Sequence, residues 1–196
     1  MIQSFRTCLS LAALALCTSS FAQTAVKTGD YRRVVTKLDD DGRSVVMIDE
    51  RAPVVAGRSA NGTSDVWATT KTPAPISFTE DLGKTKVGIS PPRKGTSFRV
   101  VDFAPTTEAI AKLPLDTVMK IVGADAPRRG LPPRHPMMHR TRSVDYAVVV
   151  SGEINLMLDE GEVALKAGDV IVQQATNHAW INRGKDYARV VFVLVD

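Results

Sequence analysis

Two histidines, His139 and His178, and one acidic residue, Asp145, are the side chains in this sequence best suited to chemistry at a single site. The segment MHRTRSVDYAVVV carries His139, Thr141 and Asp145 at odd-numbered positions, directly before an apolar run. Side chains alternate between the two faces of a β-strand, so these three are expected to project together while Arg140 and Arg142 face outward.

His178 follows one strand later, within the polar bend of GDVIVQQATNHAWIN. Two neutral imidazoles and one carboxylate on a rigid scaffold suit a divalent Fe, Mn, Ni or Zn ion and leave coordination positions open for a substrate or dioxygen. We therefore predict a divalent metal bound by His139, Asp145 and His178, with the two histidines as candidate catalytic residues. Two alternatives stay open: metal-free proton transfer with an imidazole as the base, or histidines that only form hydrogen bonds at strand ends.

Other polar and aromatic side chains near these residues are candidates for a substrate pocket. Thr141 and Gln173 could meet a small molecule, and Trp180 is expected either to line the pocket or to fill the core. Tyr146 should point away from the cavity by strand alternation and pack in a core. His135, which stands between an arginine and a proline, is expected to be a solvated loop residue.

Short β-branched segments separated by turn residues dominate the sequence and predict an all-β fold, either a sandwich or a barrel. Residues 31–38 and 43–48 flank Asp-Asp-Asp-Gly and predict a hairpin. Further strands are predicted near 66–67 and 85–87, at 97–103, and in the segments 153–165, 166–173 and 188–196. One or two short helices are predicted after residue 106, with Thr107 and Asp116 as N-caps and a break at Pro114.

The segment from 139 to 182 resembles the two conserved motifs of the cupin superfamily. In the first motif the family has His-x-His, then a glutamate and a glycine, and this sequence has His139, Thr141, Asp145 and Gly152 at those spacings. The positions of the second motif are taken by Gly168, Asp169, Gln173, Ala175, His178 and Asn182. Thr141 replaces a histidine that is a metal ligand in the family, Asp145 replaces the glutamate, and Gln173 replaces a proline.

This resemblance implies a cupin or jelly-roll-like β-barrel with one or two short helices before the motif-bearing strands. It also implies metal ligands at His139 and His178, and at Asp145 if the shorter side chain reaches. Dimerisation through an added N-terminal strand is common in the family, so a homodimer is a further expectation.

The N-terminus has the features of a secretory signal peptide over residues 1–22. Arg6 precedes a short apolar stretch from 9 to 17, and Ser20-Phe21-Ala22 offers small residues at a cleavage site. Residues 23–196 would then form one cupin-type domain, exported to the periplasm or secreted. Both cysteines, Cys8 and Cys17, fall in the segment to be removed, which excludes thiolate chemistry in the mature chain.

The composition limits the kinds of molecule that the chain is expected to bind. Without Arg6 the chain carries 24 basic and 21 acidic residues of mixed sign along the sequence, and aromatic residues make up 6%. Nucleic-acid binding would call for basic residues clustered on one element with aromatic partners, and no apolar stretch of the mature chain is long enough to span a membrane. The expected partner is a small oxygen-bearing organic substrate.

The reaction expected from these features is metal-dependent dioxygenation, decarboxylation or isomerisation. A metal-free isomerase or dehydratase that uses a histidine base is the first alternative. A non-catalytic cupin that binds a small molecule is the second, since a fold does not fix a function.

Overall fold

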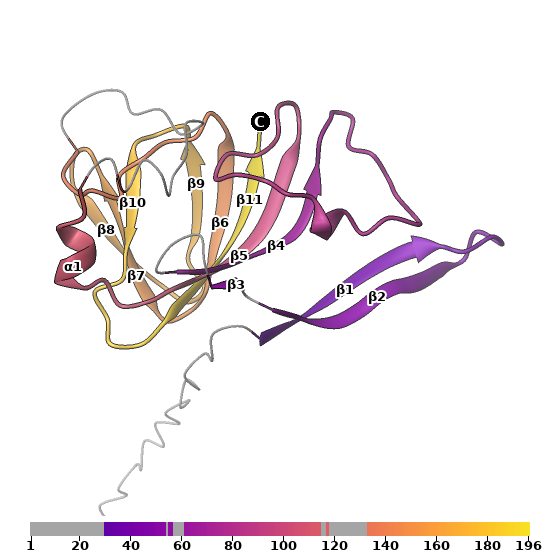
Figure 1. Ribbon diagram of the computed structural model, residues 1–196, viewed down its shortest axis with the longest axis horizontal. Coiled ribbons are helices and arrows are strands. Elements are labelled where there is room, and N and C mark those ends of the chain that lie inside the picture. Colours follow the sequence, from indigo (N-terminus) through magenta and orange to yellow (C-terminus); the bar gives the residue numbers. More distant parts are fainter. Residues whose placement is uncertain (1–29, 54, 57–60, 115–116, 118–132) are drawn as a thin grey trace, which may run out of the picture.

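The chain is folded almost entirely as β-strands, as seen in a computed structural model that describes residues 30–196 apart from 54, 57–60, 115–116 and 118–132 (Figure 1). The elements, in chain order, are β1 (Asp30–Leu38), β2 (Ser44–Pro53), β3 (Val55–Ala56), β4 (Gly62–Thr69), the 3-10 helix η1 (Leu82–Lys84), β5 (Thr96–Phe103), α1 (Glu108–Ala111), β6 (Val144–Ser151), β7 (Glu153–Leu158), β8 (Glu162–Lys166), β9 (Val170–Gln174), β10 (His178–Ile181) and β11 (Ala188–Val195). The all-β prediction is confirmed.

Two sheets form the walls of a barrel, and the core lies between them. The larger sheet has the strand order β3-β4-β5-β11-β6-β9, and the smaller sheet has the order β10-β7-β8. Val149, Val190 and Phe192 of the larger sheet pack in one buried cluster with Ile154 of the smaller sheet, and Trp180 packs against it. The strand order is not sequential, because β11 returns from the end of the chain to pair with both β5 and β6.

Strand alternation explains how β11 and its neighbours are buried. Val190 and Phe192 on β11 face the core, while Arg189 points to the opposite face of the sheet. There it forms a two-pronged ion pair with Asp102 on the neighbouring strand β5, and both side chains are buried. The predicted strands 97–103 and 188–196 are therefore confirmed, and the second is covered on both faces along most of its length.

The predicted hairpin is formed by β1 and β2, which make a separate two-stranded sheet. The hydroxyl of Tyr31 lies 2.7 Å from that of Ser64 on β4. The guanidinium of Arg33 donates to the carbonyl oxygen of Val66 at 3.1 Å and to both carboxylate oxygens of Asp81 at 2.9 and 2.6 Å. These contacts tie the base of the hairpin to the barrel.

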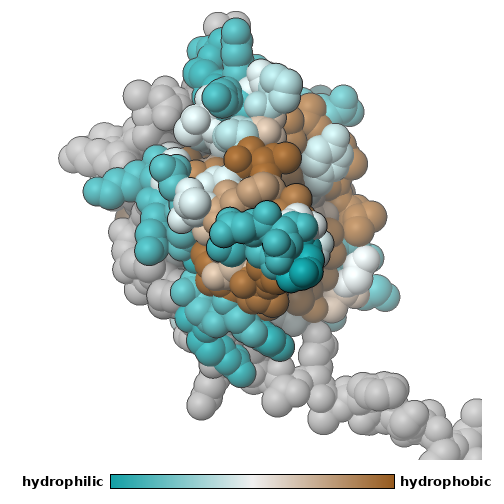
Figure 2. All heavy atoms as spheres, turned by 90° about the vertical axis from the view of Figure 1, so that its right-hand side faces the viewer, coloured by the Kyte–Doolittle hydropathy of each residue, from teal (hydrophilic) through white to brown (hydrophobic). Residues whose placement is uncertain are grey.

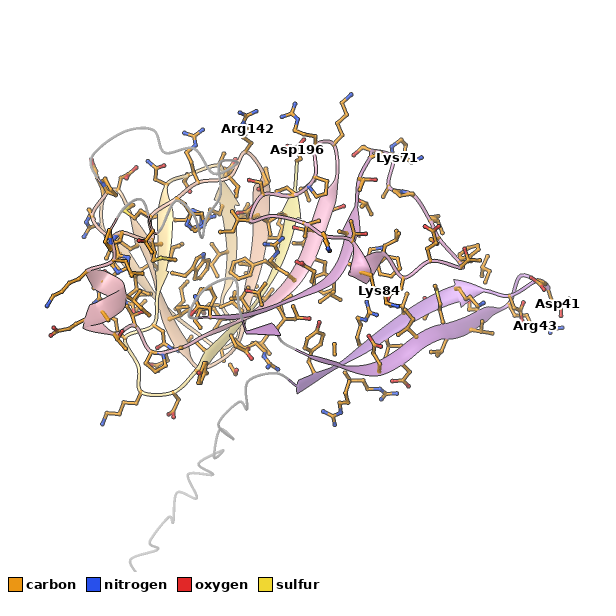
Figure 3. The ribbon with its side chains drawn as sticks, viewed as in Figure 1. Asp41, Arg43, Lys71, Lys84, Arg142 and Asp196 are labelled. Atoms are coloured by element: carbon orange, nitrogen blue, oxygen red, sulfur yellow. The ribbon has the colours of Figure 1, made fainter. Side chains whose placement is uncertain are left out.

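The tip of the hairpin projects beyond the barrel, where Figure 3 shows Asp41 and Arg43. Gly42 adopts a left-handed conformation with φ of 76°, which suits a glycine in a tight turn. The carboxylate of Asp39 accepts hydrogen bonds from the backbone N–H groups of Asp41 and Arg43. The turn residues read from the sequence thus close the hairpin as expected.

Three predictions of local structure need correction or fall outside the described residues. Residues 85–87 follow η1 as an irregular extended segment rather than as a strand, since no neighbouring strand pairs with them. The N-cap Thr107 is confirmed at α1, whereas Asp116 and the signal-peptide region 1–22 lie outside the described residues. Tyr146 points away from the barrel interior as expected, but it is 51% exposed to solvent and does not pack in a core.

Apolar side chains remain exposed on the outside of the barrel. Viewed from the side toward which the hairpin points, Figure 2 shows apolar surface around the hydrophilic hairpin tip. The exposed large apolar residues on β6 and β9 are Tyr146, Val148, Val150, Val170 and Val172. Among the described residues, no helix is long and apolar enough to cross a membrane.

Candidate functional site

The two predicted histidines lie side by side where β10 begins. The backbone N–H of His139 donates to the carbonyl oxygen of His178 at 2.9 Å, and the reverse bond has the same length. This isolated antiparallel bridge holds the centres of the two imidazole rings 4.5 Å apart at an angle of 56°. The bridge thus brings together residues 39 positions apart in the sequence, as the motif resemblance implied.

Backbone carbonyl groups orient both imidazoles. The Nδ1 atom of His139 lies 2.8 Å from the carbonyl oxygen of Met137, and Nδ1 of His178 lies 2.8 Å from that of Thr176. A carbonyl oxygen only accepts hydrogen bonds, so each Nδ1 carries the proton and each Nε2 presents a lone pair. This is the arrangement in which histidine ligates a metal, because the bond at the other ring nitrogen fixes the tautomer.

Burial keeps His178 neutral. Its side chain is 3% exposed, and burial, with a smaller contribution from the charge on His139, lowers the pKa of His178 to about 3. The hydrogen bond to the Thr176 carbonyl opposes this shift. The imidazole is therefore a hydrogen-bond acceptor or a metal ligand at neutral pH, and a weak base.

Asp145 is a buried carboxylate on β6 held by neutral donors. Its Oδ1 lies 2.5 Å from the hydroxyl of Ser143, and its Oδ2 accepts from the hydroxyl of Thr141 at 3.3 Å and from the amide of Gln173 at 3.0 Å. Burial raises the pKa of Asp145, and these hydrogen bonds together with the nearby charge of Arg99 oppose the rise. The site therefore contains an acidic group whose charge is only partly compensated.

The side chain of Gln173 on β9 lies between the carboxylate and the imidazole. Its Nε2 donates to Oδ2 of Asp145 at 3.0 Å and to the unprotonated Nε2 of His178 at 3.1 Å. Both amide hydrogens are therefore used. The side chain is 5% exposed, and its Oε1 is buried without a hydrogen-bond partner among the described residues.

Thr141 and Ser143 complete the hydrogen-bond network around Asp145. The strand β6 begins only at Val144, so these two residues sit in the bend that leads into it. Thr141 and Ser143 are nevertheless buried, while Arg142 is exposed and points away from the barrel (Figure 3). The predicted inward direction of the odd-numbered side chains holds, although a regular strand does not produce it.

A tight bend between β9 and β10 presents His178. Ala175 adopts a left-handed conformation there with φ of 50°, and its N–H donates to the carbonyl oxygen of Ser143 at 3.1 Å. The cupin motif has a glycine at this position, and this chain keeps the conformation with a side chain that disfavours it.

Gly152, the glycine of the first motif, has φ of 75°, and an added Cβ would lie 2.8 Å from the carbonyl oxygen of Tyr187.

Trp180 belongs to the aromatic part of the core. Its ring is 5.2 Å from that of Phe192 in an edge-on arrangement and 6.0 Å from that of Phe103. Of the two roles considered for Trp180, these contacts support core packing. A contact with substrate stays a prediction.

The remaining histidine, His135, is not the solvated residue that was expected. It is 8% exposed, and its Nδ1 accepts a hydrogen bond from the backbone N–H of Met137 at 3.2 Å. Burial and the nearby charge of Arg183 lower the pKa of His135. His135 thus lies buried near Arg183 and Glu162, a tertiary neighbourhood that the flanking arginine and proline did not indicate.

Sequence reasoning missed two polar side chains near the site, Ser143 and Arg99. Ser143 stands at an odd-numbered position between Thr141 and Asp145. The same alternation that predicted their inward direction could therefore have predicted that of Ser143. Arg99 interrupts an otherwise apolar strand, is 6% exposed, and donates hydrogen bonds to the carbonyl oxygens of Gly88 and Ile89. A cation inside a strand of this kind could have been noticed from the sequence alone.

The side chains of the site meet some of the requirements of a metal site. Among the described residues, no three His, Cys, Asp or Glu side chains lie close enough together to hold a metal ion. His139 and His178 have the tautomer and the proximity that two ligands need, and the amide of Gln173 lies between His178 and Asp145. Two imidazoles flanked by a buried amide oxygen without a partner suit a divalent ion of the first transition row.

Comparisons of the sequence with known proteins point to one family. The cupin domain model matches residues 126–194. Phomopsin biosynthesis cluster protein C′ of Diaporthe leptostromiformis is 35% identical over 84% of this chain and 77% of its own length. A cupin-domain-containing oxidoreductase of Aspergillus ruber is 29% identical over 84% of this chain and 71% of its own length.

A cupin 2 conserved barrel domain protein from Salinispora arenicola is similar in structure, with a TM-score of 0.35 and 12% identity over 69% of this chain and 76% of that one. The motif positions, the match to the cupin domain model and the similarity in sequence to the two fungal relatives agree. The chain belongs to the cupin superfamily.

Proposed function

We propose that this protein is a metal-dependent cupin enzyme, an oxidoreductase that acts on a small organic molecule with oxygen donors. The proposal rests on one observation above all: two imidazoles, each fixed by a backbone carbonyl, stand together with unprotonated Nε2 atoms. The similarity to a cupin-domain-containing oxidoreductase favours redox chemistry over decarboxylation or isomerisation.

His139 and His178 would hold the metal, and Asp145 would lie beside it. A bound divalent ion of this kind supplies Lewis-acid or redox chemistry at its open positions. The chain's own groups would position the substrate: the hydroxyls of Thr141 and Ser143 hold the carboxylate of Asp145 in place. Trp180 and its aromatic neighbours would exclude water from that side.

The metal-free alternative needs a histidine that can take up a proton near neutral pH. Burial lowers the pKa of His178 to about 3, which disfavours this imidazole as a base near neutral pH. Its value as a metal ligand is not reduced, because a metal binds the neutral form.

Elemental analysis of the protein purified without a histidine tag tests the proposal. We expect close to one Fe, Mn, Ni or Zn per chain in the wild type, lost in His139→Ala and in His178→Ala. The matched control is His135→Ala, which removes the third histidine and should keep the metal. A wild type that takes up no metal after reconstitution with each ion would exclude the proposal.

Export is part of the same proposal. A signal peptide over residues 1–22 would place the enzyme in the periplasm or outside the cell. N-terminal sequencing of the protein recovered from cell fractions should find Gln23 as the first residue. An intact N-terminus in the cytoplasmic fraction would contradict it.

A further inference from the structure

The amide of Gln173 is the least explained polar group of the site. A buried polar atom without a partner destabilises a fold by about 1–3 kcal/mol, so each instance in a native structure calls for an explanation. Oε1 of Gln173 is such an atom, on a side chain that is 5% exposed. The family motif has a proline at this position, which offers no side-chain oxygen.

The position of the amide matches that of a ligand. Ligands at right angles around a metal, with bonds of about 2.1 Å, lie about 3.0 Å apart. The terminal atom of Gln173 lies 3.1 Å from Nε2 of His178 and 3.0 Å from Oδ2 of Asp145. The distances from this terminal atom to Nε2 of His178 and to Oδ2 of Asp145 are therefore those expected between neighbouring ligands of one metal ion.

The present orientation of the amide suits the metal-free chain. Its two N–H groups satisfy two acceptors, Nε2 of His178 and Oδ2 of Asp145, that a cation would otherwise face. A cation at His178 would repel these hydrogens and attract the amide oxygen. Rotation of the terminal amide by half a turn exchanges nitrogen and oxygen within nearly the same volume.

We propose that Gln173 is a metal ligand through Oε1, in place of the histidine that Thr141 replaces, and that its amide turns from hydrogen-bond donor to ligand when the metal binds. This inference rests on the proposed metal site. It gives a third ligand to a site in which the described His, Cys, Asp and Glu residues do not form a group of three. In the rotated amide, the oxygen that is unpartnered in the metal-free chain would face the metal.

Titration of the chelator-treated full-length protein with Co²⁺ tests this inference, with affinity and the visible absorption spectrum as readouts. Gln173→Leu keeps a similar volume but offers no donor atom, and should weaken Co²⁺ binding at least about tenfold and change the spectrum. Gln173→Glu keeps an oxygen ligand without the N–H donors, and should bind Co²⁺ at least as tightly as the wild type. Gln174→Leu is the matched control, because its neighbouring side chain is exposed.

The outcomes separate this inference from the proposed function. Wild-type affinity and spectrum in Gln173→Leu would overturn the ligand role while the metal site stands. Equal weakening in Gln173→Leu and Gln173→Glu, with both variants folded by circular dichroism, would also overturn it, since only the N–H donors would then matter. Failure of the wild type to bind Co²⁺, with no difference from His178→Ala, would overturn the proposed function itself.

Discussion

Two clusters of buried polar side chains lie in this barrel, and they are built on opposite principles. On the outer face of the large sheet, Nε and Nη2 of Arg189 donate to the two carboxylate oxygens of Asp102 at 2.6 and 2.7 Å. Near the start of β6, the described residues that donate hydrogen bonds to the carboxylate of Asp145 do so from neutral hydroxyl and amide groups. One cluster joins a cation to an anion, and the other contains a carboxylate whose donors are all neutral.

The difference between the clusters indicates their roles. A buried ion pair with both charges matched crosslinks two strands and offers nothing to a ligand. The cluster around Asp145 combines a buried carboxyl group, an unprotonated imidazole and the unpartnered Oε1 of Gln173, which are oxygen and nitrogen donors of the kind that bind a divalent cation. Sites that bind ligands often keep such unsatisfied groups, because the ligand completes them.

The largest expected effect comes from breaking the matched pair. Arg189→Met would leave the carboxylate of Asp102, which is fully buried, without its cation and should lower the free energy of unfolding by about 3–5 kcal/mol. Urea unfolding measures this loss. The control is Arg183→Met, which breaks a similar two-pronged pair with Glu162 on the surface and should change stability by less than about 1 kcal/mol. Equal effects at the two sites would contradict the structural role.

The ion pair between Arg33 and Asp81, which joins the hairpin to the barrel, is less buried than the pair between Arg189 and Asp102 and extends the comparison to a third polar contact. The hydrogen bond and charge of Arg33 lower the pKa of Asp81, although burial opposes the shift. The stabilisation is thus fully present above the ordinary value of 3.8 and is lost as the pH falls through the lower folded-state value. Asp81→Asn should lower the free energy of unfolding by about 1–3 kcal/mol at pH 6, and the difference from wild type should shrink below pH 3.8.

Unfolding curves at several pH values test this dependence, and hydrogen exchange should show faster exchange in β1 and β2 of the variant. Asp41→Asn is the control, because its ion pair with Arg43 at the hairpin tip is exposed. A difference that stayed constant down to pH 2 would show that the charge of Asp81 does not link the hairpin to the barrel.

Much of the fold and the positions of the two histidines could be predicted from the sequence. Strand alternation predicted the inward direction of Thr141 and Asp145, and the motif resemblance implied that His139 and His178 lie at one site, where the structure joins them by a backbone bridge. Both depend on local periodicity or on a pattern that covers one continuous segment.

The rest depends on contacts between distant segments. The amide of Gln173 reaches Asp145 because β9 pairs with β6 in a register that places these two residues opposite each other. The same holds for the ion pair between Arg33 and Asp81, and for the burial of His135 near Arg183 and Glu162. Residue types and spacing do not fix such registers or loop paths, so these features could be seen only in the folded chain.

A smaller effect concerns the backbone strain at the site. Ala175 holds a left-handed conformation that suits glycine, so Ala175→Gly should raise the free energy of unfolding by about 1 kcal/mol. Ala164→Gly, on the exposed face of β8, is the control and should lower it by about 0.5–1 kcal/mol. Thermal unfolding compares the two variants. A loss of stability in both would show that the bend at Ala175 is not strained.

The smallest expected effect is the most informative about the site. In the metal-free chain, Gln173→Leu leaves two buried acceptors, Nε2 of His178 and Oδ2 of Asp145, without these N–H donors, a cost of about 1–3 kcal/mol, and it removes the unpartnered Oε1, a gain of similar size. These contributions oppose each other, so urea unfolding in EDTA should find less than about 1 kcal/mol of change. A loss as large as that of Arg189→Met would make the amide a structural crosslink and remove the contrast between the two clusters. A near-neutral result would mean that folding gains little from a buried amide at this position, which leaves ligand binding as its role.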